Sequence, residues 1–326
     1  MKSKISLFMA VVLIALSSVQ CRKKKSEEPP AEEPTPVTTT GPNSVADIIA
    51  ANGSALNTVT LDVSLATTLT INGNIFEIPA NAFQTSTGGT VGGIVNLMVK
   101  TIMTKSQIIL TGAGANSSNS KLVATKGCIK TTASQSTQTL RLVPAANFIV
   151  NVKDVNASSS PMKKFYAPKV TVDDSTKYWA LGTDISDIPQ TTFTASANVF
   201  HKATLDSLKW LNVGVQDTSA VAPKTAVSVS VTASMFNKGN TMMYLSYDGS
   251  LTVGALFELT PSGGIFRISN VPQGRVCHII GISAINGQYY CASMIYVVPA
   301  PGAPTVNLNL VPVSQSQMIA TVNALP

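Results

Sequence analysis

The stretch covering residues 74–129 alternates short apolar segments with turn residues, and this pattern restricts the possible folds more than any other feature of the chain. It begins NIFEIPANAFQTSTGGTVGGIVNLMVK and ends KLVATKGCI. Short runs rich in Val and Ile, each bounded by Gly, Pro, Asn or Ser, are typical of strands joined by turns. Because no long apolar stripe with a helical period accompanies them, we predict an all-β fold.

The same pattern predicts strands on both sides of this stretch. Residues 58–71 alternate apolar and polar side chains, as expected for a strand with one solvated face. Asn286-Gly287 separates two runs that are apolar on both faces, which predicts a hairpin in the middle of its sheet. The other strands are expected at residues 75–78, 94–103, 107–110, 122–129, 139–142, 148–155, 227–232, 242–247, 256–259, 265–269 and 306–311.

Two short helices are also expected. Residues 44–56 have the mixture of apolar and polar side chains that makes one or two helical turns before Gly53. The C-terminal segment SQSQMIATVNALP places Met318, Ile319 and Val322 on a shared helical face.

Residues 1–20 resemble a lipoprotein signal peptide. Lys2 and Lys4 precede an apolar run of about a dozen residues, which is too short to span a bilayer. The following LSSVQC resembles a bacterial lipobox, in which a signal peptidase cuts before a cysteine that carries a diacylglyceryl anchor. The resemblance implies lipid attachment at Cys21, and ordinary cleavage after Ser17 is the alternative.

Residues 21–44 favour an anchored protein. The segment RKKKSEEPPAEEPTPVTTTGP is rich in Pro, Glu and Thr and has only Val37 as a sizeable apolar residue, so it is expected to be a disordered tether. A tether of this length reaches several tens of Å at about 3 Å per residue. We therefore predict a globular body held off a membrane by its lipid anchor, in the cell envelope, as an outer-membrane lipoprotein.

A family resemblance rests on the order of five segments. These are an F-x-IPANAF turn, VGGIVNLMVK, TKSQIIL, a loop, and LVATKGCI. Together they resemble a family of Bacteroidetes-type surface lipoproteins, whose first domain is similar to the β-sandwich of ankyrins, netrin receptors and zona occludens scaffolds. In those proteins the sandwich is a binding or packing module without catalysis. The later segment GGIFRISNVPQG resembles carboxypeptidase-regulatory-like and transthyretin-like sandwiches, with Phe266 packed inward and Pro272 and Gly274 reversing the chain.

These observations predict two antiparallel β-sandwich domains after the signal peptide and tether. The first is expected at residues 45–156 and the second at residues 205–326. Between them lies a connector at residues 157–204, rich in Ser, Pro, Lys and Asp, whose Tyr178-Trp179 is expected to pack the domains together.

The cysteines indicate neither a disulfide framework nor a zinc site. Besides Cys21 the chain has Cys128, Cys277 and Cys291, which are few and widely spaced. A hairpin turning at residues 286–287 puts Cys277 opposite a residue near Ile295 or Tyr296, too far from Cys291 for a bridge. We therefore expect unpaired, buried thiols that act as small apolar side chains.

The charge distribution excludes nucleic acid as a partner class. Although the net charge is +7, six basic residues and no acidic residue precede residue 26, and the rest of the chain is nearly balanced. Aromatic residues do not interleave with basic clusters as single-strand binding requires.

No catalytic motif, cofactor motif or metal-ligand spacing is present. His201 and His278 belong to no such pattern, and His278 is expected to be a hydrogen-bonded strand residue. Glu77 and Glu258 are glutamates in predicted strands, but nothing in the sequence brings them together as a hydrolytic pair needs. Four aspartates of the connector lack the ligand ladder of a calcium loop and are interpreted as a solvated turn: Asp173, Asp174, Asp184 and Asp187.

The function predicted from these features is a membrane-anchored, non-enzymatic lipoprotein that binds a polypeptide or glycan at the cell surface. Any binding surface is expected on the loops at residues 84–93 and 112–120, where packing constrains the side chains least. A structural subunit of an envelope assembly and a secreted hydrolase are the alternatives. The sequence does not indicate the oligomeric state.

Overall fold

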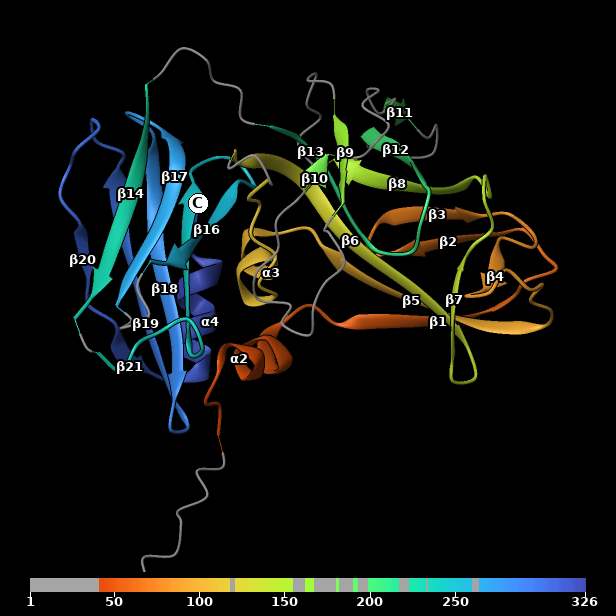
Figure 1. Ribbon diagram of the computed structural model, residues 1–326, viewed down its shortest axis with the longest axis horizontal. Helices are drawn as coiled ribbons and strands as arrows, with labels where there is room; N and C mark the ends of the chain where they lie inside the picture. Colours follow the sequence, from red (N-terminus) through yellow and green to blue (C-terminus); the bar gives the residue numbers. More distant parts are fainter. Residues whose placement is uncertain are drawn as a thin grey trace, which may run out of the picture. The chain divides into compact units, whose positions relative to one another are not determined.

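The computed structural model describes residues 41–117, 121–154, 162–166, 180–181, 190–192, 199–216, 223–232, 234–259 and 264–326. The chain divides into two compact units, residues 1–39 and 40–326, and all described residues belong to the second. This unit is all-β, with antiparallel sheets and three short helices among the described residues (Figure 1). The predicted signal peptide, Cys21 and nearly all of the tether lie outside the described residues.

Two sheets are built mainly from the first two thirds of the chain. In spatial order the described part of the first, an eight-stranded sheet, contains β1 (Leu56–Asp62), β5 (Ile94–Ile102), β6 (Val123–Gln135), β13 (Trp210–Gln216), β9 (Lys163–Tyr166) and β10 (Ala180–Leu181), with β7 (Gln138–Leu142) pairing with β6 and β4 (Phe83–Thr85) pairing with β7. The second, five-stranded in the described residues, contains β11 (Gln190–Thr192), β12 (Val199–Leu205), β8 (Phe148–Asp154), β3 (Asn74–Ile78) and β2 (Thr67–Ile71).

One hydrophobic core joins these two sheets. Leu97 and Val99 enter it from β5, and Phe76, Phe148 and Val150 enter it from the second sheet. All five side chains are fully buried or nearly so. The predicted turn at residues 79–83 is confirmed, because Asn81 has a positive φ of 56° and Phe83 is buried in this core.

The third sheet contains the C-terminal strands. Its described strands number eight, in the order β20 (Val306–Leu308), β14 (Lys224–Val231), β17 (Ile265–Pro272), β16 (Val253–Glu258), β15 (Thr241–Tyr247), β18 (Val276–Ile285), β19 (Gln288–Val297) and β21 (Val311–Val313). The edge strands β20 and β21 are separated in sequence only by Asn309 and Leu310, and β20 also contacts β19. The sheet therefore curls round a core of its own, into which Leu310 and Phe266 are buried.

The predicted hairpin is confirmed, but only its first strand, β18, is central in this sheet; part of its second strand, β19, pairs on one side only among the described strands. Asn286 and Gly287 have φ values of 51° and 80°, and Ile285 pairs with Gln288 across the turn. Strand β18 lies between β15 and β19 and is buried on both faces over most of its length.

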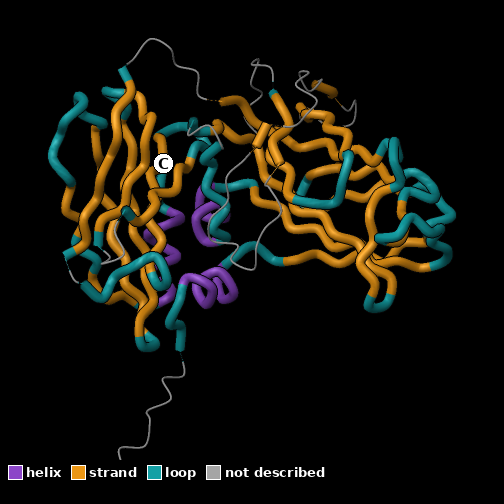
Figure 2. The backbone as a smooth tube through the Cα atoms, viewed as in Figure 1, coloured by secondary structure: helices purple, strands orange, loops and turns teal. Residues whose placement is uncertain are grey.

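Three helices gather on one face of the third sheet (Figures 1 and 2). They are α2 (Val45–Asn52), α3 (Lys105–Leu110) and α4 (Gln315–Asn323); α2 contacts β18, α4 contacts β19, and α3 contacts both other helices. Ile48, Ile108 and Met318 are completely buried in a second core, which also contains Trp210 and Ile282. Strands of the first and third sheets therefore share one apolar layer. The expected helices at residues 44–56 and 314–326 correspond to α2 and α4.

The strand predicted at residues 107–110 is wrong, because this segment is helix α3. Thr104 Oγ1 accepts from the Gln107 main-chain N–H, and the Gln107 side chain accepts from the Thr104 main-chain N–H, which forms a capping box. The apolar run from Ile108 to Leu110 packs in the shared core rather than in a sheet.

The single strand predicted at residues 58–71 is two strands, β1 and β2, in different sheets. Between them Asp62 Oδ1 accepts from both the main-chain N–H and the hydroxyl of Ser64, at 3.0 and 2.8 Å. This local turn diverts the chain, although the alternation of side chains continues through it.

Sheet membership differs from the domain division expected from the sequence. Strands β12 and β13 belong to the second and first sheets, and the third sheet begins with β14 at Lys224. The segment after residue 205 therefore adds β13 to the first sheet before the chain enters the third.

Candidate functional site

A small cavity opens where β16 changes neighbours. Residues 253–256 of β16 pair with β15, from Val253 opposite Ser246 to Leu256 opposite Met243. The next residues, Phe257 and Glu258, pair instead with β17. The two strands therefore separate at this point, and the space between them is the β15–β16 cavity.

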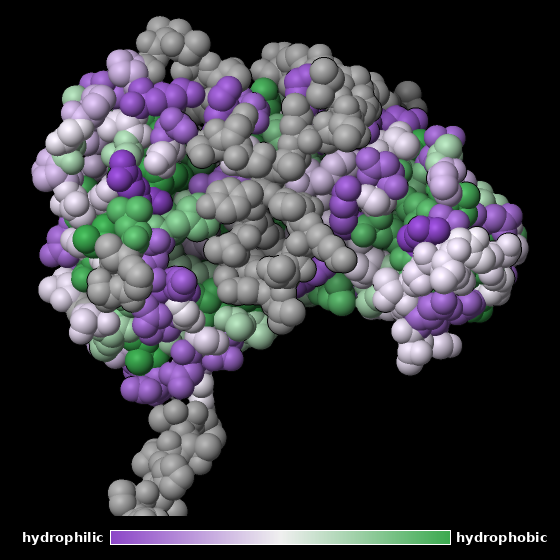
Figure 3. All heavy atoms as spheres, in the orientation of Figure 1, coloured by the Kyte–Doolittle hydropathy of each residue, from purple (hydrophilic) through white to green (hydrophobic). Residues whose placement is uncertain are grey.

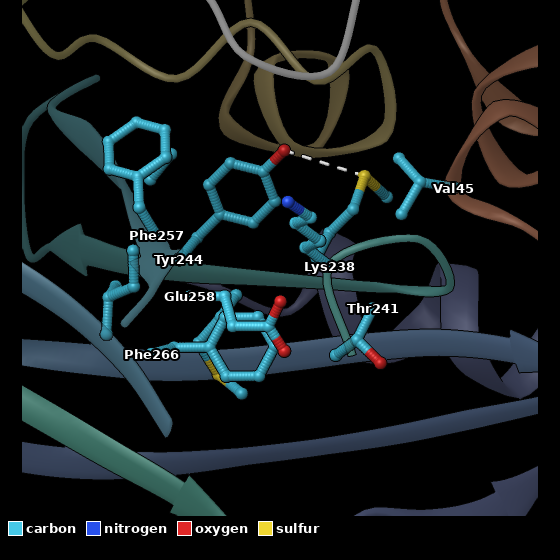
Figure 4. A pocket seen from close by; sticks show the side chains of 11 residues that line it. Val45, Lys238, Thr241, Tyr244, Phe257, Glu258 and Phe266 are labelled. Atoms are coloured by element: carbon cyan, nitrogen blue, oxygen red, sulfur yellow. Dashed lines mark hydrogen bonds between the residues drawn. The ribbon is translucent and has the colours of Figure 1, made fainter. Parts of the chain in front are cut away.

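The β15–β16 cavity has a volume of about 130 Å³ and is lined by both apolar and charged side chains (Figure 4). Phe266 and Met243 belong to the core inside the third sheet, whereas Tyr244 belongs to the core on the helical side. Both cores reach the cavity because no strand pairing closes the sheet there.

A rigid turn forms one wall of the cavity. Asn237 Oδ1 accepts from the Gly239 main-chain N–H at 2.9 Å, and the Asn237 carbonyl accepts from the Thr241 N–H at 2.8 Å. The Gly239 carbonyl also accepts from the Val45 N–H at the start of α2, at 2.9 Å. These bonds fix the main chain on both sides of Lys238, whose side chain lines the cavity.

The cavity contains two opposite charges. Glu258 is half-buried, and its Oε1 atom is enclosed without a hydrogen-bond partner among the described residues. Lys238 is exposed and also lines the cavity; in Figure 4 its amine is directed toward the Tyr244 ring and the Glu258 carboxylate toward Thr241. Within the described part of the chain neither residue forms an ion pair.

Tyr244 contributes a neutral aromatic wall. Burial raises the pKa of its hydroxyl well above the usual value of 10.0, so the ring is uncharged at every physiological pH. Its Oη donates to Met242 Sδ at 3.6 Å.

A second candidate surface is the β19 edge, defined as residues 292–297. Strand β21 pairs with Tyr289, Tyr290 and Cys291 only, and no other described strand pairs with this side of β19. Ile295 and Val297 are 68% and 57% exposed there. On the face shown in Figure 3, by comparison, green apolar residues occur in small groups among purple polar ones. An unpaired edge that carries large apolar side chains is a template for another strand.

A buried charge cluster connects the first two sheets. Lys126 Nζ donates to Asp154 Oδ1 at 3.0 Å, and His201 Nε2 lies 3.0 Å from Asp154 Oδ2. The side chains of Asp154 and His201 are fully buried. Lys126 is an extra residue in the β6–β13 pairing, since Val213 is opposite Gly127 and Gly214 is opposite Thr125. This bulge directs Lys126 toward the second sheet.

The buried position of this cluster indicates a structural role, because no substrate reaches a fully enclosed imidazole. The other histidine, His278, lies in β18 as a hydrogen-bonded strand residue, as expected, with its Nδ1 2.9 Å from Asp248 Oδ1. No hydrogen bond within the described residues joins His201 or His278 to a serine or cysteine.

The other residues singled out in the sequence lie apart. Glu77 accepts from Asn151 Nδ2 at 2.6 Å in the second sheet, whereas Glu258 lines the cavity in the third. The structure therefore does not bring the two glutamates together. The connector aspartates and Tyr178-Trp179 lie outside the described residues.

The two predicted binding loops behave differently. In the loop at residues 84–93 most side chains are at least partly exposed, although Val91 is buried. The prediction of an exposed loop at residues 112–120 is wrong for residues 112–117, which are buried. Asn116 explains this, because its amide donates to the Ala255 carbonyl at 3.0 Å and accepts from the Ala255 N–H at 2.6 Å. The loop thereby docks on β16; residues 118–120 lie outside the described part.

Cys128, Cys277 and Cys291 are buried thiols that form no disulfide, as predicted. Cys277 pairs with Tyr296 and Cys291 with Ile282, so the two thiols are on separate rungs of the hairpin.

Among the described residues no group of three or more His, Cys, Asp or Glu is placed to hold a metal ion. None of the helices in that part of the chain has the length and apolar character that a bilayer crossing requires. Comparison of the chain with protein-family models, curated proteins and solved structures finds no match. The family resemblance drawn from the sequence motifs therefore stays a prediction.

Proposed function

We propose that this protein is a membrane-anchored, non-enzymatic lipoprotein of the cell envelope that binds a polypeptide through the β19 edge. The observation that carries this proposal is that no described strand pairs with residues 292–297 on the side of β21, although β20 contacts β19, together with the exposure of Ile295 and Val297. A strand added there gains main-chain hydrogen bonds to β19 and buries both side chains. A glycan offers neither a strand of amides nor a matching apolar face, so we favour the polypeptide.

The anchor is the lipid that we propose for Cys21. The apolar segment before it and the Pro- and Glu-rich tether after it support this assignment. Palmitate labelling of the wild-type protein in its native host is expected, and Cys21→Ala is expected to abolish it. Labelling that persists in Cys21→Ala contradicts the anchor.

The partner is tested by photo-crosslinking on intact cells. A photoreactive residue at position 295 is expected to capture a foreign polypeptide, whereas the same residue at position 65 is the control. Leu65 is 62% exposed but lies between β1 and β2, away from the β19 edge. Equal capture at both positions, or none at position 295, contradicts the proposal.

The same edge also favours a second function, a structural subunit of an envelope assembly in which β19 pairs with another copy of this chain. Crosslinks at position 295 that contain only this protein support the assembly. Crosslinks to a different polypeptide support recognition.

A further inference from the structure

The β15–β16 cavity contains two charged side chains that have no part in the proposed binding of a strand at the β19 edge. An enclosed carboxylate oxygen without a hydrogen-bond partner is expensive, because burial of an unpaired polar atom costs free energy. Oε1 of Glu258 is such an atom within the described residues. A ligand ammonium that binds the other carboxylate oxygen, which is not enclosed, stabilises the charge of the whole group through charge and hydrogen bonding together.

Lys238 supplies the complementary charge at the opening of the cavity. It is exposed, whereas Oε1 of Glu258 is enclosed, so the positive end lies nearer to solvent than the negative end. The two charges line one cavity and do not pair with each other. A ligand that carries both signs engages both groups, whereas a simple cation or anion meets one attractive and one repulsive charge.

The remaining walls are apolar, and the space is small. Phe257, Phe266 and Met243 provide apolar surface beside the charges. The cavity volume of about 130 Å³ is close to that of an engineered protein cavity of about 150 Å³ that binds one benzene molecule. A ligand with one side-chain-sized apolar group therefore fits, and an oligosaccharide does not.

We propose that the β15–β16 cavity binds a free α-amino acid with an apolar side chain. Its ammonium group contacts Glu258, its carboxylate contacts Lys238, and its side chain lies against Phe257 and Phe266. This inference goes beyond the proposed polypeptide binding and concerns a different part of the third sheet.

Isothermal titration of the full chain tests the proposal with three probes of similar shape. L-leucine carries both charges, 4-methylpentanoate lacks the ammonium group, and 3-methylbutylamine lacks the carboxylate. L-leucine is expected to bind roughly ten- to hundredfold more tightly than either analogue, the range expected when a charged hydrogen-bonding partner is removed. Equal affinity for the three probes overturns the proposal. So does a failure to bind both L-leucine and a second apolar amino acid, L-phenylalanine.

Two variants assign the charges to their residues. Glu258→Gln is expected to weaken L-leucine binding about tenfold or more and to strengthen 4-methylpentanoate binding, because it removes a repulsive charge. Lys238→Gln is likewise expected to weaken L-leucine binding and to strengthen 3-methylbutylamine binding. Glu77→Gln and Lys202→Gln are matched controls on the second sheet. Thermal unfolding of each variant separates lost binding from lost folding. Loss of L-leucine binding in the controls contradicts the assignment.

The amino-acid and polypeptide proposals fail independently. Crosslinking at position 295 reports the β19 edge and does not depend on the cavity, and L-leucine titration does not depend on a partner protein.

Discussion

At the scale of single residues, Asp154 combines complete burial with two cationic or potentially cationic neighbours. Its oxygens are each 3.0 Å from a nitrogen, one on Lys126 and one on His201. Water is excluded from the carboxylate, so the interactions with these two side chains replace its hydration. The bulge at Lys126 is therefore part of the structural connection between the first two sheets.

We expect Asp154→Ala to lower the free energy of unfolding by about 3–5 kcal/mol, because it leaves Lys126 and His201 near the interior without their shared partner. Urea denaturation measures the change. The control is Asp206→Ala, whose carboxylate is 55% exposed and 3.9 Å from Lys209, and whose effect is expected within about 0.5 kcal/mol. Similar losses in both variants contradict a special role for Asp154.

The buried thiols lead to a prediction about pH. Burial raises the pKa of Cys277 to about 12 and that of Cys291 to about 11, from the ordinary value of 9.0. In the folded state both thiols are protonated at pH 9 to 10, whereas unfolded thiols ionise there. Their contribution to stability is therefore complete below pH 9 and is lost as the pH rises through 11 and 12.

Iodoacetamide at pH 8.5 is expected to leave Cys277 and Cys291 unmodified in the folded protein and to alkylate both in urea, because the thiolate is the reactive form and both thiols are buried. Peptide mass spectrometry measures the modification. Fast alkylation of either residue without urea shows that its surroundings open readily.

The positions of the buried thiols can be predicted from the sequence, whereas the contacts of Asp154 cannot. The positions of Cys277 and Cys291 in the hairpin follow from Asn286-Gly287, because this turn fixes the register. The partners of Asp154 do not, because the Lys126 bulge and the contact between the sheets depend on pairing over long sequence distances.

At the scale of elements, the segment around α3 shows where local pattern is ambiguous. The run Ile108-Ile109-Leu110 is apolar and its two isoleucines are β-branched, so it favours a strand by composition. The capping box between Thr104 and Gln107 is the signal in the sequence that indicates a helix instead. The loop after α3 has the small polar residues of an exposed turn, but tertiary contact through Asn116 buries it.

Asn116 is expected to hold this loop on β16. Asn116→Ala leaves the N–H and the carbonyl of Ala255 without these partners, so we expect a loss of about 1–3 kcal/mol in the free energy of unfolding. Asn116→Asp keeps the acceptor for the N–H but places a buried carboxylate oxygen against the Ala255 carbonyl, so it is expected to lose at least as much. Asn309→Ala, at an exposed position, is the matched control in the same denaturation experiment. A loss no larger than that of the control contradicts this role.

The cavity itself was not predictable from the sequence. The sequence places Glu258 in a strand. Its position in a cavity depends on the change of pairing partner along β16, from β15 at residues 253–256 to β17 at residues 257–258. Neither strand has a Gly-rich or proline signal at the point of separation. Pairing register therefore determines this site, and residue pattern alone does not.

At the scale of the whole molecule, the first and third sheets share an apolar layer. Trp210 and Ile108 come from the region of the first sheet, and Ile282 comes from the third, yet all three are in one core. Leu122, just before β6, is also buried in the core inside the third sheet. The all-β class follows from strand patterning, whereas this sharing depends on contacts that no local pattern specifies.

We therefore expect residues 40–326 to unfold in one cooperative transition. Ile108→Ala removes a fully buried side chain from the shared core, and a loss of about 2–5 kcal/mol is expected. Hydrogen exchange followed by mass spectrometry is expected to show faster exchange in both β5 and β18 in this variant. Faster exchange confined to the first sheet indicates two independent folding units.

The two-residue connection between β20 and β21 has a consequence for folding kinetics. Val229 in β14 pairs with Val306 in β20, so closing this sheet brings together residues far apart in sequence. The hairpin of β18 and β19 pairs residues that are close in sequence, so we expect it to form early in folding. The pairing of β14 with β20 joins residues far apart in sequence, and the entropy cost of closing that long loop is expected to delay it. Leu310 enters the core beside Gly281, where a Cβ atom would lie only 2.7 Å from Leu310 Cδ2. We therefore expect the final closure of the sheet and the burial of Leu310 to occur together, as a late step in the folding of the third sheet.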